Sequence, residues 1–96
     1  MAKGYLIARL NVTDAEKFAQ YAKLASAASA AFGARPLVRG GRFETLEGDE
    51  RTRNVILEFD SYEAARAYYF SDAYQAAKVA REGAAVAEFV LVEGTD

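Results

Sequence analysis

The segment Arg39-Gly40-Gly41-Arg42 combines residue types that can hold an anion. Arginine presents paired, planar N–H donors that match the two oxygens of a carboxylate. Glycine reaches backbone conformations that are closed to other residues, and it lets a ligand or another chain segment approach closely. Glu47, in the Leu-Glu-Gly that follows, either orients one of these arginines or sits in a turn. The segment is therefore a candidate anion site or a β-bulge with solvated arginines.

A second polar group surrounds an interruption in the later helical pattern. Tyr69, Ser71 and Tyr74 cluster around a predicted helix break, where hydroxyls and free backbone N–H groups could meet a small anion. Arg81 follows on the continuing helix. In the structural alternative, Ser71 is only a helix cap, Tyr74 belongs to the core and Arg81 pairs with a nearby acidic residue.

Composition excludes several classes of chemistry. The 96 residues contain no histidine and no cysteine, so we expect no metal site and no cofactor, whether zinc, iron, haem or flavin. A net charge of −2 gives no basic surface for nucleic acid. No apolar run approaches the roughly 20 residues that cross a bilayer, and no signal segment opens the chain, so we expect no membrane association and a cytoplasmic protein. The length fits one domain, 1–96.

Hydrophobic periodicity predicts the order βαββαβ. Strands are expected at 5–10, 35–39, 54–59 and 86–92, with 43–46 as an extension of the second pairing. Thr13 and Glu16 form a capping-box pattern for a first helix that runs to about Phe32. Its predicted buried stripe consists of Phe18, Ala22, Ala25, Ser29 and Phe32. Ser61 and Ser71 cap the two parts of the second helix, which ends near Arg81. This order predicts an α+β fold of the ferredoxin-like type, an antiparallel four-stranded sheet with both helices on one face.

The sheet face without helices indicates a partner. On the first strand this face carries Tyr5, Ile7 and Arg9, and the last strand is apolar on both faces. A solvated face would alternate more cleanly between apolar and polar residues, so we expect a homodimer that packs sheet against sheet. Alternation also places Arg39 and Glu58 on this face, where Arg9 and Glu58 are expected to pair across neighbouring strands.

The chain resembles the DUF1330 family of small bacterial proteins over nearly its whole length. The motifs that carry the resemblance are Arg-Gly-Gly (39–41), Leu-Glu-Gly (46–48), Glu-Phe-x-Ser-x-Glu-x-Ala (58–65), Tyr-x-Ser-x-x-Tyr-Gln (69–75), Arg81 and Glu-Gly (93–94). The family usually has Ser-Pro-Glu-Tyr where this chain has Ser-Asp-Ala-Tyr at 71–74. The resemblance implies the dimeric α/β-barrel superfamily, in which two sheets face each other, and it implies no established activity.

Two functions follow from these observations. One is a small homodimeric protein that binds a small organic ligand, with an anion as one option, or that has a structural role. The other is a cofactor-independent enzyme, an oxygenase or isomerase, as the superfamily resemblance implies. In that version Arg39 or Arg42 stabilises an enolate or carboxylate, and Tyr69 or Tyr74 exchanges a proton.

Overall fold

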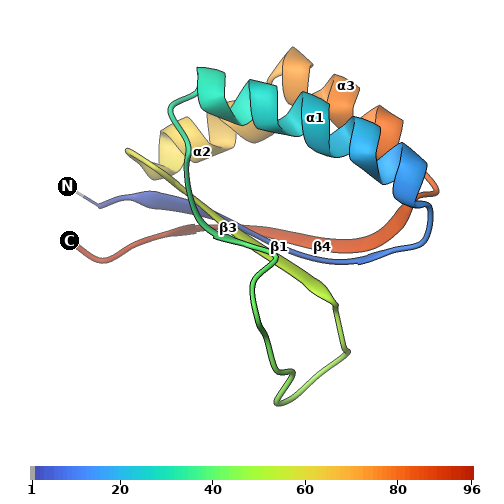
Figure 1. The fold of residues 1–96 in the computed structure, drawn as a ribbon. Helices are drawn as coiled ribbons and strands as arrows, with labels where there is room; N and C mark the ends of the chain where they lie inside the picture. Colours follow the sequence, from blue (N-terminus) through green and yellow to red (C-terminus); the bar gives the residue numbers. More distant parts are fainter. Residues whose placement is uncertain (1) are drawn as a thin grey trace.

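The computed structural model describes residues 2–96, which form one antiparallel sheet covered on one side by helices (Figure 1). The strands are β1 (Gly4–Val12), β2 (Arg35–Arg39), β3 (Arg53–Phe59) and β4 (Ala85–Glu93), in the sheet order β2-β3-β1-β4. The helices are α1 (Ala15–Ala31), α2 (Tyr62–Tyr69) and α3 (Asp72–Arg81). The predicted ferredoxin-like α+β fold is confirmed, with the second helix divided in two at the predicted break.

The three helices begin at side chains that accept hydrogen bonds from the first turn. Ser61 caps α2 and Ser71 caps α3, as predicted, because each hydroxyl accepts from the backbone N–H three residues on. The cap of α1 is Asp14, whose carboxylate accepts from the N–H of Lys17 at 3.1 Å. The predicted capping box at Thr13 is wrong by one residue, since the Thr13 hydroxyl instead reaches the carbonyl of Gly83.

The core lies between the sheet and the helices. Alternate residues of β1, Leu6, Ala8 and Leu10, point into it, and Tyr68 and Tyr74 fill it from α2 and α3. On α1 the fully buried residues are Tyr21, Ala28 and Ser29. The predicted α1 stripe is therefore partly wrong, because of its members only Ser29 is fully buried and Phe32 is 38% exposed.

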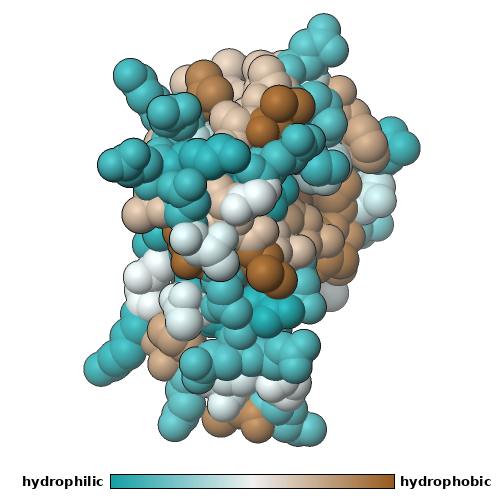
Figure 2. Space-filling model, turned by 90° about the vertical axis from the view of Figure 1, so that its right-hand side faces the viewer, coloured by the Kyte–Doolittle hydropathy of each residue, from teal (hydrophilic) through white to brown (hydrophobic). Residues whose placement is uncertain are grey.

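The loop between β2 and β3, residues 40–52, projects away from the sheet on the side opposite the helices (Figure 1). The predicted strand at 43–46 is not formed, and Leu46 is 82% exposed. In the view of Figure 2 this lower part of the molecule is largely hydrophilic, with a few hydrophobic side chains among the polar ones. Within residues 2–96, no helix combines the length and apolar character needed to span a membrane.

Candidate functional site

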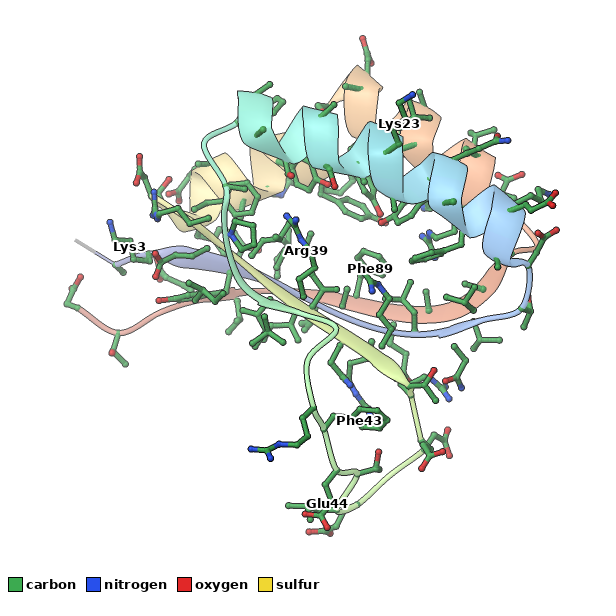
Figure 3. The ribbon with its side chains drawn as sticks, in the orientation of Figure 1. Lys3, Lys23, Arg39, Phe43, Glu44 and Phe89 are labelled. Carbon is green, nitrogen blue, oxygen red and sulfur yellow. The ribbon has the colours of Figure 1, made fainter. Side chains whose placement is uncertain are left out.

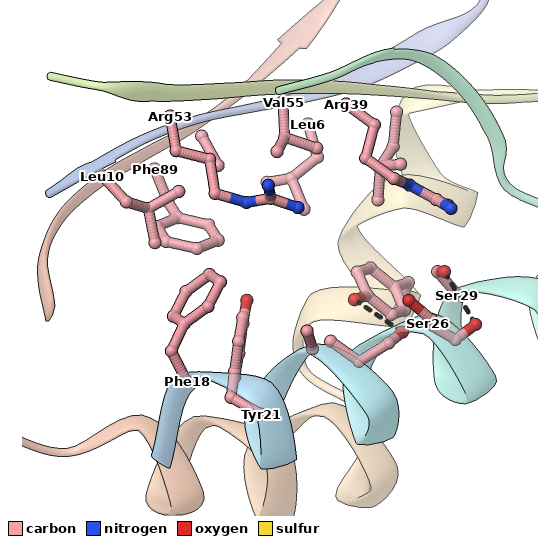
Figure 4. A pocket seen from close by; sticks show the side chains of 15 residues that line it. Leu6, Leu10, Phe18, Tyr21, Ser26, Ser29, Arg39, Arg53, Val55 and Phe89 are labelled. Atoms are coloured by element: carbon pink, nitrogen blue, oxygen red, sulfur yellow. Dashed lines mark hydrogen bonds between the residues drawn. The ribbon is translucent and has the colours of Figure 1, made fainter. Parts of the chain in front are cut away.

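A cavity of about 80 Å³ lies between α1 and the inner face of the sheet (Figure 4). One water needs roughly 10–15 Å³ by this measure, so the cavity has room for several. Most of its wall is apolar, and no carboxylate is among its lining residues. These are Leu6, Ala8, Leu10, Phe18, Tyr21, Ala22, Ala25, Ser26, Ser29, Arg39, Arg53, Val55, Leu57, Tyr68 and Phe89.

Two arginines enter the cavity from adjacent strands. Arg39 ends β2 and Arg53 begins β3, and both guanidinium groups point from the sheet towards α1 (Figure 4). The expectation that Arg39 shares the outer face with Glu58 is wrong. The pairing of β2 with β3 shifts between Pro36 and Val38, and a shift of one residue turns every later side chain to the opposite face. Arg39 therefore faces the helices.

The Arg53 guanidinium is positioned by two neighbours. Its Cζ lies 5.5 Å from the centre of the Phe18 ring, a cation–π distance. On the other side is Gly40, with φ +71°, where an added Cβ would lie 2.9 Å from Nη1 of Arg53. Arg53 is half-buried, whereas Arg39 is exposed and marks the place where the cavity meets solvent.

Neither cavity arginine is neutralised by the protein. Among residues 2–96, Arg39 and Arg53 take part in none of the ion pairs and in none of the side-chain hydrogen bonds. The cavity wall thus carries two guanidinium charges, and within the described part of the chain, residues 2–96, no carboxylate lines the wall beside them. A partly buried positive charge favours an anion from solution.

Arg81 adds a third guanidinium behind the aromatic wall. Its Cζ lies 5.1 Å from the ring centre of Tyr21 and 4.8 Å from that of Phe89, and both rings line the cavity. The expected pairing of Arg81 with an acidic neighbour is replaced by these ring contacts, and its buried Nε has no hydrogen-bond partner among the described residues. Arg81 therefore makes the aromatic wall more electropositive.

Tyr74 is part of the core, and its hydroxyl meets the hydroxyl of Tyr21 at 3.0 Å. Burial raises the pKa of both phenols, and it also raises the pKa of Tyr68. At neutral pH all three therefore stay protonated and do not act as bases. Tyr68 donates to the carbonyl of Ala25, and in the Tyr21–Tyr74 pair one hydroxyl donates to the other.

The remaining predicted residues of the helix break lie outside the cavity lining. The Ser71 hydroxyl makes two hydrogen bonds at the junction of α2 and α3. It accepts one from the backbone N–H of Tyr74 at 3.1 Å and donates one to the carbonyl of Tyr68 at 2.7 Å. The Tyr69 ring packs on Tyr74 with ring centres 4.9 Å apart, and it lines a separate open groove beside β4.

The loop residues of the predicted site do not reach the cavity. Arg42 borders an open depression with Phe43 and Glu44, while Arg39 points the other way, towards the helices (Figure 3). Glu47 lines another depression that also includes Arg9. Gly41 has open space around it. Of the predicted set, the structure brings together Arg39, Gly40 and, behind the wall, Arg81.

Sequence reasoning missed Arg53 and Tyr21 as residues of the cavity. Arg53 was placed in the loop before the strand at 54–59, although it lies two positions before Val55 and four before Leu57, a spacing that puts it on the inner face once the strand is extended. Tyr21 follows Phe18 by three residues, a spacing that puts both on one side of α1.

The outer face of the sheet has a polar end and an apolar middle. Tyr5 is paired with Glu58 in the strand register, and its hydroxyl donates to that carboxylate at 3.0 Å. Arg35 also donates to Glu58, at 2.9 Å, and these two bonds hold the pKa of Glu58 below its usual range, Arg35 having the larger effect. The expected pair of Arg9 with Glu58 is wrong, because the register places Arg9 opposite Asn54.

The apolar middle of this outer face is formed by Ile7 and its cross-strand neighbours. Ile7 is opposite Ile56 on β3 and Val90 on β4, and Val92 lies opposite Tyr5. Val90 is 54% exposed and Val92 is 43% exposed. This region is therefore available for contact with another surface.

The fold and the arginine-lined cavity define a ferredoxin-like α+β protein with a small site beneath α1. The protein-family model described as "Domain of unknown function (DUF1330)" matches residues 3–95, and the chain belongs to this family. The resemblance seen in the sequence motifs is thereby confirmed. No match to a curated protein was found.

Several solved structures share the fold at low sequence identity. The RPA0582 protein of unknown function from Rhodopseudomonas palustris has a TM-score of 0.79 at 15% identity, with 99% of this chain and 84% of that chain covered. A dimeric ferredoxin-like protein of unknown function from Thermobifida fusca has a TM-score of 0.62 at 18% identity, covering 99% and 92%. SnoaB, a cofactor-independent oxygenase from Streptomyces nogalater, has a TM-score of 0.57 at 13% identity, covering 100% and 96%.

Proposed function

We propose that this protein is a homodimer that binds a small organic anion in the cavity between α1 and the sheet. The observation that carries the proposal is the convergence of Arg39 and Arg53, two guanidinium groups without a carboxylate partner, on an otherwise apolar space. Ligand sites are typically apolar cavities with a few polar groups that fix orientation. Here the polar groups are cations, so the ligand they select is an anion.

The two arginines have different parts in binding. Arg39 is exposed at the mouth, so its charge attracts an anion from solution, although salt screens that attraction. Arg53 is half-buried and held against Phe18, so its N–H groups are oriented before the ligand arrives. Preorganised donors of this kind lose less conformational entropy on binding than a free side chain.

The homodimer is supported by the apolar middle of the outer sheet face. Ile7, Ile56, Val90 and Val92 are adjacent there in the strand register, and a monomer would leave this surface in water. The Thermobifida fusca neighbour is described as dimeric, and two such sheets packed face to face would form an α/β barrel. The cavity is on the other side of the sheet, so each subunit of this dimer keeps its own site.

Thermal unfolding tests the binding proposal directly. We expect small organic acids, as sodium salts, to raise the melting temperature above that of a sodium chloride control, while their neutral amides do not. Arg53→Gln should abolish the stabilisation, and Arg42→Gln, on the projecting loop, should retain it. Equal stabilisation of both variants would mean that the anion binds elsewhere.

A cofactor-independent oxygenase is the second candidate, favoured by the shared fold with SnoaB. In that case Arg39 and Arg53 would stabilise negative charge that develops on the substrate, and the apolar wall would exclude water. The cavity tyrosines do not supply a base, because burial raises the pKa of Tyr21 and of Tyr68. Mass spectrometry of a bound acid after incubation in air separates the two functions, since an oxygenase must yield an oxidised product.

A further inference from the structure

The cavity wall restricts the chemical class of the anion. Resting on the proposed function, we infer that the ligand is a compact monocarboxylate with a flat apolar body, of the benzoate class. Its carboxylate would meet the Arg39–Arg53 end of the cavity, and its body would lie between the aromatic rings and alanines of the remaining wall.

The charged head must be small. The wall has few polar side chains. They are the two arginines, the two serines of α1 and the hydroxyls of the two tyrosines. The two oxygens of a carboxylate match the two-pronged face of one guanidinium. The Ser29 hydroxyl already donates to the carbonyl of Ser26, and the Tyr68 hydroxyl to that of Ala25. A phosphate would therefore turn its remaining oxygens towards apolar side chains, which costs free energy for every unpaired oxygen.

The body must be apolar and thin. Phe18 from α1 and Phe89 from β4 face each other across one end of the cavity, with Leu10 beside them (Figure 4). Further along α1 the lining residues are Ala22 and Ala25, whose side chains are small. Aromatic rings favour offset or edge contacts with another ring. A planar ring makes such contacts with Phe18 and Phe89, and a puckered ring does not.

The volume sets the size of the ligand. The cavity of about 80 Å³ is smaller than the roughly 150 Å³ that holds a whole benzene molecule. A benzoate-sized acid would therefore enter with part of its ring only and keep its carboxylate near the exposed Arg39, whereas a nucleotide or a fatty acid is far too large. The site therefore selects a small ring acid rather than a large cofactor.

Calorimetric titration of the full chain with four probes tests this inference. The probes are benzoate, its neutral isostere benzamide, cyclohexanecarboxylate, which has the same charge and a puckered ring, and inorganic phosphate. We expect benzoate to bind at least about tenfold more tightly than each of the other three. Arg53→Gln should weaken benzoate binding by about tenfold or more, while Arg42→Gln retains wild-type affinity. If the ligand-free melting temperature shows that Arg53→Gln is poorly folded, the exposed Arg39→Gln replaces it.

Each other result overturns a distinct part of the account. If phosphate or cyclohexanecarboxylate binds as tightly as benzoate or more tightly, and Arg53→Gln weakens that binding, the inferred ligand class is wrong and the proposed anion site is retained. If benzamide binds as tightly as benzoate, the site does not recognise the negative charge, and both the inferred ligand class and the proposed function are wrong. Both also fail if none of the three anions binds, or if benzoate binding is indifferent to Arg39 and Arg53.

Discussion

Gly40→Ala separates the conformational role of the Arg-Gly-Gly segment from its role in the site. Gly40 has φ +71°, a left-handed conformation in which alanine is strained. The Arg53 guanidinium also lies beside Gly40, since an added Cβ would lie 2.9 Å from Nη1 and 3.7 Å from Cζ. The substitution therefore perturbs both the loop backbone and the position of Arg53.

The two effects have different magnitudes and different readouts. The left-handed conformation should cost about 1–2 kcal/mol in the free energy of unfolding. The contact with Arg53 adds little to that cost, because its guanidinium, although held against Phe18 in the wild type, can shift away from an added methyl group. Its displacement would remove a charged hydrogen bond to the ligand, a loss of about 1.5–3 kcal/mol, or about 10- to 150-fold in affinity.

Two other glycines of the same loop provide matched controls. Gly48 has φ +92° and open space around its Cβ position, so Gly48→Ala should lose similar stability and keep wild-type benzoate affinity. Gly41 has open space and is not among the glycines of positive φ, so Gly41→Ala should keep both. Urea denaturation measures stability, and calorimetry measures affinity on the same samples.

The reasoning is refuted if Gly40→Ala binds benzoate with wild-type affinity. It is also refuted if Gly40→Ala and Gly48→Ala lose affinity equally, because the loop conformation, and not the approach to Arg53, would then govern the site.

Three further predictions concern the outer face and the composition. Ile7→Lys should convert the proposed dimer to a monomer at micromolar concentration, because it introduces a charge into the apolar middle of the outer sheet face; a dimer mass for this variant by light scattering would contradict this. Glu58→Gln should lower stability at neutral pH. Arg35 and Tyr5 hold the folded-state pKa of Glu58 low, so the wild-type advantage should be full above about pH 5 and shrink as pH falls below the ordinary glutamate value of about 4.3 and through the lower folded-state value. A constant difference in urea stability down to low pH would refute that assignment. Finally, purified protein should carry no stoichiometric zinc, iron, haem or flavin, and elemental analysis that finds one transition metal per chain would disprove this.

The fold could be predicted because its signals are local. Strand alternation placed Leu6, Ala8 and Leu10 on the inner face, and hydroxyl caps placed the starts of α2 and α3. The outer-face network differs from the prediction because register is a non-local property. Alternation shows that Arg9 and Glu58 share a face, but only the pairing of β1 with β3 decides that Tyr5 is opposite Glu58.

The site could be predicted only in part, because the direction of the Arg39 side chain depends on a register shift between β2 and β3. An uninterrupted β2 would put Arg35 and Arg39 on the same face, and the shift between Pro36 and Val38 separates them. The glycines at 40–41 indicated an irregularity, but they follow Arg39, whereas the shift precedes it. Helix α1 was difficult for a different reason, since its many alanines leave several faces equally suited to burial.

The measurement that tests the central claim most directly is an NMR titration of the arginine side-chain Nε–Hε signals with benzoate. The claim is that Arg39 and Arg53 together hold an anion beneath α1. We predict saturable shifts for these two signals with one common dissociation constant, while the signals of Arg42 on the loop and Arg66 on α2 do not move. Shifts confined to Arg42, or equal shifts of all four signals, would contradict the account.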